Sequence, residues 1–236
     1  MIPWVRVTVL VDNEPNEGLI NEWGLSMWVE THAWQCLFDA DTSPSVLEHN
    51  LNKLKISPSK LDFAVLSHHH YDHSGGFSYI GRVSPNLTTY MPPGPQDEFI
   101  SWGLKPCIVK GTKQIAESAY VIGPLKAWAG FYEIALAVDV EKIGLIILVG
   151  CSHPGVDRIA VTAAEELGRR VHAVIGGFHN PSRDTLDRLV ESVEKVFPAH
   201  CTGDSGKKYL FKKYPGKYGK VKTGTVIEFG TVLNKS

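Results

Sequence analysis

The chain of 236 residues carries 24 Lys and Arg against 25 Asp and Glu, a formal net charge of −1 at pH 7. This balance argues against a protein built mainly to hold nucleic acid, and the length suits one α/β domain or two small ones. The longest apolar run, residues 143–150, is far shorter than the about 20 residues of a membrane-spanning helix, and no secretory signal pattern is visible. Four widely separated cysteines favour a reducing cytoplasm over a disulfide framework.

The first third of the chain predicts strands with one intervening helix. Alternating or continuous apolar residues indicate strands over residues 5–11, 25–30, 34–38 and 63–66. Ser43 followed by Pro44 marks a helix start, because a hydroxyl can cap the first turn and proline has no amide hydrogen to lose. Residues 81–130 are rich in proline and glycine and predict a long region of loops and short elements that shapes a substrate site.

The second half predicts a clearer alternation. Its elements are a hairpin over 133–140 and 143–149, a helix over 156–167 stopped by Gly168, a strand over 171–175, a helix capped by Ser182, and strands over 195–199 and 221–229. Helices that alternate with strands, together with hairpins in both halves, predict one domain over residues 1–236 in which helices cover two sheets.

Histidines, ten in all, are the unusual feature. His68, His70, Asp72 and His73 form the pattern H-x-H-x-D-H directly after a predicted strand. Residues 68, 70 and 72 of an extended segment point to one side, and a turn can bring His73 round to join them. Imidazole and carboxylate together suit zinc and other first-row ions. A solvated loop or an affinity tag explains the pattern less well, because a tag would lie at a terminus. Since side chains alternate along an extended segment, His69 is expected to point away from the site.

Three more histidines follow predicted strands. His153, His179 and His200 each come just after a strand end, and ligands at the carboxyl ends of neighbouring strands converge in space. Each taken alone could be a core histidine, but the repeated placement favours one site. His32, His49 and His172 have no such context. Because neighbours of a ligand in an extended segment point away from it, Cys151 and Cys201 are expected to be buried and inert.

With these motifs in hand, the chain resembles the metallo-β-lactamase superfamily. The sequence LFDAD at 37–41 resembles the aspartate-bearing first motif of that family, and the histidine signature and later single histidines follow it. The sequences GCSHPG, GGFH and HCTG resemble the branch of 7,8-dihydropterin-6-methyl-4-(β-D-ribofuranosyl)-aminobenzene-5'-phosphate synthase-type proteins. The resemblance implies an α/β fold, a four-layer αββα sandwich of two mixed sheets covered by helices, with a metal site at one edge.

The same resemblance implies one or two divalent metal ions, zinc first, with Mn, Fe, Ni and Mg as alternatives. His68, His70 and His153 would hold the first metal, and Asp72, His73 and His200 the second. Asp39 would orient the ligand histidines. The superfamily places a metal-bridging aspartate between the last two ligand histidines, but here that loop carries His179, which either ligates metal or faces substrate. Trp23 stands where a histidine is expected in this branch.

The implied chemistry is hydrolysis of an ester, lactone, thioester or phosphoester by a metal-bound hydroxide, with Asp72 and His179 as catalytic groups. A first alternative is a dihydropterin-synthase-like condensation that releases pyrophosphate. That reaction needs flat aromatic walls, for which the candidates are Trp23, Trp28, Phe77, Trp102 and Trp128. A second alternative is a metal-binding or redox module that has lost hydrolysis.

A basic run over 207–222 holds seven lysines and no acid, with four aromatic residues between them. It predicts a solvated helix face with packing aromatics; contact with phosphate or RNA, for instance through Lys207 or Lys208, is the alternative. The expected partner is a small-molecule substrate, with no membrane and no nucleic acid, and the oligomeric state is left open.

Overall fold

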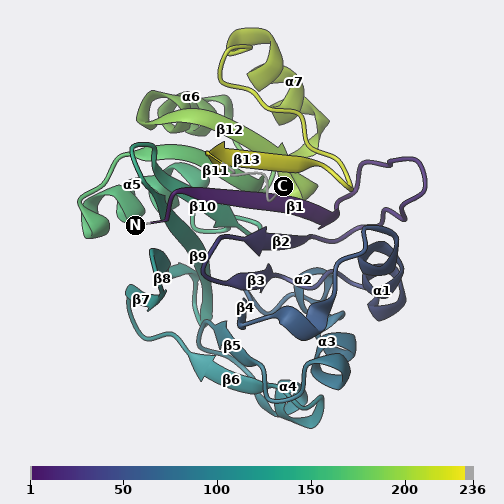
Figure 1. Ribbon diagram of the computed structural model, residues 1–236. Coiled ribbons are helices and arrows are strands. Elements are labelled where there is room, and N and C mark those ends of the chain that lie inside the picture. Colours follow the sequence, from purple (N-terminus) through teal and green to yellow (C-terminus); the bar gives the residue numbers. More distant parts are fainter. Residues whose placement is uncertain (1, 232–236) are drawn as a thin grey trace.

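The strands form two sheets that pack face to face in a computed structural model describing residues 2–231 (Figure 1). The first sheet has the order β13-β1-β2-β3-β4-β5-β6. Its strands are β1 (Trp4–Val11), β2 (Ser26–Glu30), β3 (Gln35–Phe38), β4 (Phe63–Val65), β5 (Thr88–Met91), β6 (Lys105–Ile108) and β13 (Val226–Gly230). Strands β3 to β6 run parallel, whereas β13, β1, β2 and β3 pair antiparallel.

The second sheet has the order β12-β11-β10-β9-β8-β7. Its strands are β7 (Lys113–Ala116), β8 (Ala119–Trp128), β9 (Phe131–Val140), β10 (Gly144–Val149), β11 (Val171–Gly177) and β12 (Val193–Ala199). Strands β10, β11 and β12 are parallel, so their carboxyl ends lie at one edge of the sheet.

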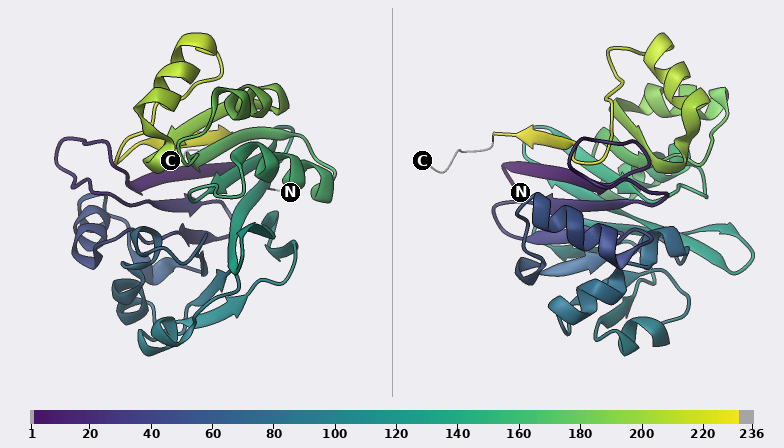
Figure 2. Two further views of the ribbon diagram at one scale, coloured as in Figure 1. Left: turned by 180° about the vertical axis from the view of Figure 1, so that it is seen from behind. Right: turned by 90° about the vertical axis from the view of Figure 1, so that its right-hand side faces the viewer.

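Helices cover the outer face of each sheet (Figure 2). The helices are α1 (Pro44–Lys53), α2 (Tyr71–Ser74), α3 (Phe77–Val83), α4 (Asp97–Ser101), α5 (Val156–Leu167), α6 (Arg183–Ser192) and α7 (Gly203–Lys213), with short 3₁₀ turns at Pro58–Lys60 and His200–Thr202. Helices α1, α3 and α4 lie on the first sheet, and α5, α6 and α7 on the second. None of the helices in the described residues combines the length and apolar character that a bilayer-spanning helix needs.

Three apolar layers hold these elements together. Val7 and Phe38 of the first sheet meet Leu148 of the second in the central layer. The other two layers lie between each sheet and its helices, one around Ile159 and the other around Phe77. Because a strand points alternate side chains to opposite faces, one sequence of apolar residues fills both a central and an outer layer. The expected αββα sandwich is therefore confirmed.

The predicted helix ends are mostly correct. Gly168 ends α5 in the left-handed conformation at φ 61°, and Ser182 Oγ accepts a hydrogen bond from Thr185 N at 3.1 Å. Pro44 begins α1 as expected. The predicted Ser43 cap is not made, because its hydroxyl donates to Glu22 Oε2 at 2.8 Å instead.

Two expectations about strands need correction. Region 81–130 holds short elements as expected, among them α4 and the four-residue strands β5, β6 and β7, but its strand β8 spans ten residues and pairs with β9 along its length. Pro124 hides this strand in the sequence, since the register shifts between Ile122 and Leu125 to accommodate it. The last strand begins at Val226 rather than at residue 221, because residues 222–225 form a turn instead.

Candidate metal centre

Six side chains that the sequence marks as ligands converge beyond the strand ends. His68 and His70 follow β4, Asp72 and His73 lie on α2, His153 follows β10, and His200 follows β12. They form two groups whose donor atoms lie within 4.8 Å of one another: His68, His70 and His153, called triad A, and Asp72, His73 and His200, called triad B. The structure thus divides the six residues as the resemblance does.

Triad A consists of three imidazoles. His68 Nε2 lies 3.1 Å from His70 Nδ1, and the rings of His68 and His153 are 4.7 Å apart between centroids. Nitrogen ligands of a tetrahedral zinc, with bonds of about 2.0–2.1 Å, are about 3.3–3.4 Å apart. Burial, and then the neighbouring imidazoles, lower the pKa of His68, so that its ring stays neutral with a lone pair to offer.

Triad B adds a carboxylate. Asp72 Oδ2 lies 3.3 Å from His200 Nε2 and 3.9 Å from His73 Nε2. His200 Nε2 is buried and has no hydrogen-bond partner. Burial raises the pKa of Asp72, but the nearby His200 and His73 imidazoles outweigh it and leave the pKa below its usual range. A buried nitrogen without a partner, next to an ionised carboxylate, fits a divalent ion held between them.

Asp39 fixes residues of both triads. Its Oδ2 lies 2.7 Å from His73 Nδ1 and accepts from Ser67 Oγ at 2.7 Å, while its Oδ1 accepts from Ser67 N. Ser67 Oγ in turn lies 2.8 Å from His68 Nδ1, so Asp39 reaches triad A through one hydroxyl. Burial lowers the pKa of His73, but the charge and hydrogen bond of Asp39 outweigh it and raise that pKa. Both histidines are left with Nε2 turned toward the centre.

Glu133 is a supporting residue that the sequence analysis missed. Its carboxylate accepts from the backbone N–H groups of Cys151, Ser152 and His153 at 2.8–3.0 Å, and lies 3.0 Å from His153 Nδ1. Glu133 is 1% exposed. The available signal was the charged side chain of Glu133 within the mostly apolar strand β9, because a fully buried acid is rare unless it is paired.

Asp12 and Asn13 were also missed. Asp12 Oδ1 accepts from His200 N at 2.6 Å, and Asn13 Oδ1 lies 3.1 Å from His200 Nδ1. Thr223 holds Asp12 by exchanging two hydrogen bonds with its backbone. The sequence showed these residues only as the start of a polar loop, and their position just beyond the end of β1 was the signal.

His179 lies outside both triads, on the exposed rim. Its ring centroid is 4.3 Å from that of His153, and with Cys151 and Cys201 it forms another group of possible donors. A hydrogen bond to Cys201 raises the pKa of His179. The hydrogen bond from Cys151, together with that from His179, lowers the pKa of Cys201 to about 4 although burial opposes it. His69 turns away from the centre toward Pro92 O, 3.2 Å from its Nε2.

The expected burial of Cys151 is confirmed, but the expectation that its side chain points away from the triads is wrong. Its Sγ lies 3.2 Å from His73 Nε2, and its side chain is buried among the ligands. Ser152, between Cys151 and His153, lies in a turn with a φ of 60°, so the alternation of an extended segment does not apply to Cys151.

Two exposed tryptophans flank the triads. Trp128, half exposed, stacks on Phe131 with centroids 4.4 Å apart, and both rings lie 5.2 Å from His153. On the other side, Trp23 Nε1 donates to Asp72 Oδ2 at 2.9 Å, and its ring lies 4.9 Å from that of His200. The other three aromatic candidates do not line the centre, since Trp28 of β2 and Phe77 of α3 are buried in the apolar layer between the first sheet and its helices, and Trp102 packs on Phe99.

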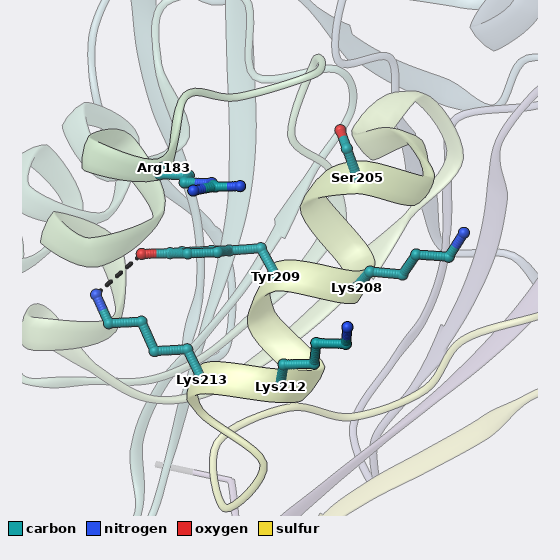
Figure 3. A pocket seen from close by; sticks show the side chains of 6 residues that line it. All are labelled: Arg183, Ser205, Lys208, Tyr209, Lys212 and Lys213. Atoms are coloured by element: carbon teal, nitrogen blue, oxygen red, sulfur yellow. Dashed lines mark hydrogen bonds between the residues drawn. The ribbon is translucent and has the colours of Figure 1, made fainter.

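The basic run lies on α7 and the segment that follows it. Arg183 and Lys213 lie over opposite faces of the Tyr209 ring, each 5.3 Å from its centroid, and Lys208 and Lys212 point away from it (Figure 3). Lys207 Nζ is 3.2 Å from Glu14 Oε1. Several lysines of this run therefore have partners within the protein.

Comparisons with known proteins agree with this arrangement. The family model of the metallo-beta-lactamase superfamily matches residues 33–96, which include Asp39 and the histidine signature. A protein of Methanocaldococcus jannaschii named 7,8-dihydropterin-6-methyl-4-(beta-D-ribofuranosyl)-aminobenzene-5'-phosphate synthase is 27% identical, over 91% of this chain and 92% of its own length.

Two solved structures extend the comparison. Tm1679, described as a metal-dependent hydrolase of the beta-lactamase superfamily, has a TM-score of 0.81 and 26% identity, covering 96% of this chain and all of that one. The metallo-beta-lactamase fold protein YhfI from Bacillus subtilis has a TM-score of 0.66 and 14% identity over the same share of each chain, and so supports the fold alone. The chain is therefore a protein of the metallo-β-lactamase fold. Its resemblance to that superfamily, including the dihydropterin-synthase-like branch, is confirmed.

Proposed function

We propose that this protein is a metal-dependent hydrolase of a small-molecule ester, lactone, thioester or phosphoester. The observation that carries the proposal is the pair of adjacent triads, in which His68, His73, His153 and His200 are fixed, through their backbone or second ring nitrogen, by a polar group outside the triads. Such support is typical of metal-ligating histidines. The likeness to a structure described as a metal-dependent hydrolase points the same way.

His68, His70 and His153 would hold one divalent ion, and Asp72, His73 and His200 a second. Their nitrogen and oxygen donors suit zinc best among common ions. When bound, such an ion supplies Lewis acidity and lowers the pKa of coordinated water to near neutrality.

The protein's own groups have distinct tasks around that centre. Asp72 Oδ2, which accepts a hydrogen bond from Trp23 Nε1 at 2.9 Å, would accept a proton from the attacking water. His179, exposed on the rim beside His153, would donate a hydrogen bond or a proton to the departing group. The Trp128–Phe131 stack keeps water from one side of triad A and offers an apolar surface to the substrate.

Metal content and hydrolysis, measured on the untagged full chain, test this proposal. We expect about two equivalents of zinc per chain after dialysis, and zinc-dependent turnover of at least one compound in a panel of esters, lactones, thioesters and phosphoesters. His153→Ala should lose one equivalent and reduce turnover to background, whereas His172→Ala, a matched histidine outside the centre, should change neither. Full metal content and full turnover in His153→Ala would contradict the proposal.

A second candidate is a dihydropterin-synthase-like condensation. It is favoured by the flat Trp128–Phe131 stack beside triad A and by the relative named as such a synthase. In this reaction a bond between the pterin methylene carbon and an arylamine nitrogen forms, the bond from that carbon to diphosphate breaks, and the amine proton leaves to solvent.

Incubation of the metal-loaded protein with both reactants separates the two candidates. A coupled product in the mass spectrum with equimolar pyrophosphate supports the condensation, whereas turnover in the hydrolase panel alone supports the first proposal. Trp128→Ala should weaken pterin binding about tenfold, in line with the 1–3 kcal/mol of a base–aromatic stack. Trp102→Ala, which alters an aromatic residue away from the centre, is the matched control.

A further inference from the structure

Cys151 lies between the two triads. Its Sγ is 3.2 Å from His73 Nε2 of triad B, and with His68 of triad A and His73 it forms a group of donor atoms within 4.8 Å of one another. Among the described residues 2–231, Cys151 is the one cysteine that shares such a donor group with a histidine of each triad. The Cys151 thiol is therefore within reach of both triads.

The backbone that places Cys151 also places a triad A ligand. Glu133 Oε1 accepts from Cys151 N at 3.0 Å, and Glu133 Oε2 accepts from His153 N at 2.9 Å. Between them, Ser152 has a positive φ of 60° and anchors the turn by donating its hydroxyl to Gly177 O at 2.7 Å. One buried carboxylate thus fixes Cys151 and His153 on the same side of the same turn.

The surroundings of Cys151 differ from those of a cysteine that only fills space. Cys36 is such a residue: it lies in the central apolar layer, and its thiol contacts the carbonyl of Leu37 at 3.3 Å. Cys151 instead faces the ring nitrogen of His73. The bridging carboxylate expected of the superfamily also has no replacement in the loop after His153. The aspartates between His153 and His200 lie on α5 and α6; they are Asp157, Asp184 and Asp187.

We propose that Cys151 supplies a thiolate shared by the two triads, in place of the bridging carboxylate that the superfamily pattern puts between the last two ligand histidines. Binding replaces the thiol proton by the ion, so one proton per Cys151 is released to solvent. Sulfur coordination should make the centre prefer zinc, cobalt or cadmium over manganese and magnesium. The inference rests on the proposed function only in that both require divalent ions held by the triads.

Cobalt(II) titration of the metal-free full chain tests the inference without any activity assay. Coordination by histidines and carboxylate gives visible d–d bands, whereas a thiolate ligand adds an intense charge-transfer band in the near ultraviolet. We expect both signals in the native protein and in Cys201→Ser, the matched control that removes the neighbouring thiol. Cys151→Ser should keep the d–d bands and lose the charge-transfer band.

The outcomes separate this inference from the proposed function. Absence of d–d bands in the native protein would overturn the metal centre itself. Visible bands without a charge-transfer band, or a charge-transfer band that survives in Cys151→Ser, would overturn the role of Cys151 alone. Loss of the band only in Cys201→Ser would assign the sulfur ligand to Cys201, which forms a donor group with His179, instead of to Cys151.

X-ray absorption on zinc-loaded Cys201→Ser covers the case in which Cys151→Ser does not fold. With Cys36 and Cys107 far from the triads, a sulfur shell at about 2.3 Å can only come from Cys151, whereas a purely nitrogen and oxygen shell at about 2.0–2.2 Å contradicts the inference. Loss of cadmium affinity in Cys151→Ser by about tenfold or more, with manganese affinity unchanged, is the expected companion result.

Discussion

Two clusters of charged and polar side chains in this protein differ in burial. The metal centre is built on the histidine signature, and the second cluster, here the Tyr209 cluster, consists of Arg183, Asp187, Tyr209, Lys213 and Tyr214. In the metal centre, His68, His73 and Asp39 have no exposed surface. In the Tyr209 cluster, the side chains of Lys213 and Asp187 keep 47% and 28% of their surface exposed.

The two clusters also differ in whether their polar atoms all have hydrogen-bond partners. In the Tyr209 cluster, both Asp187 oxygens accept hydrogen bonds, from Lys213, Tyr209 and Tyr214, so the members satisfy one another. In the candidate metal centre, hydrogen bonds fix one side of the rings of His68, His73, His153 and His200, and leave His200 Nε2 buried without a partner. Buried polar atoms without partners are costly, so their presence points to a ligand, whereas a satisfied surface cluster needs none.

The largest effect should follow removal of Asp39. Asp39→Ala leaves the Ser67 N–H, the Ser67 hydroxyl and His73 Nδ1 without their acceptor in a buried site. We expect a loss of about 3–5 kcal/mol in the free energy of unfolding, because one partner of a buried charged pair is removed. Urea unfolding of the metal-free protein measures it directly. Asp187→Ala is the control, and an equal loss in both variants would remove the distinction between the clusters.

The sequence predicted that the six triad residues converge because their positions obey a local rule: four of them follow strand ends, Asp72 and His73 lie on the short helix just beyond one, and strand ends are visible as apolar runs that stop. Most strands were predicted for the same reason, and β8 was hidden by Pro124. Glu133 and Asp12 escaped because their partners lie 18–20 and 188 positions away in the chain. The orientation of Cys151 was predicted wrongly because the alternation of an extended strand was applied to a segment that forms a turn at Ser152.

Glu133→Gln sharpens the contrast within the metal centre. Glu133 contacts His153 of triad A, whereas Asp39 reaches both triads. Loss of such a supporting contact typically costs 10–100-fold in metal affinity. We therefore expect Glu133→Gln to weaken one of two zinc sites by that factor and Asp39→Asn to weaken both. Competition with a chromophoric chelator resolves the two sites, and equal weakening of both in Glu133→Gln would show that the supports are not separate.

The smallest effect should come from Asp187→Asn, and its pH dependence has a defined sign. Hydrogen bonds from Lys213, and then from Tyr209 and Tyr214, lower the pKa of Asp187 to about 2 in the folded protein. An unfolded Asp has a pKa of about 3.9. Because the folded pKa is the lower one, the contribution of Asp187 to stability is fully present above about pH 5 and disappears as the pH falls through about 2.

Thermal unfolding of the native protein and Asp187→Asn at pH 7 and near pH 2 tests this sign. We expect a small difference in Tm at pH 7 that shrinks toward zero near pH 2, and that also shrinks with added salt because the pair is solvent accessible. A difference in Tm that grows as the pH falls would contradict the conclusion that the ionised form of Asp187 stabilises the folded protein. A difference at pH 7 as large as that caused by Asp39→Ala would mean that exposure does not separate the two clusters, and that the Tyr209 cluster stabilises the packing of α6 against α7 as strongly as the buried acids stabilise the metal centre.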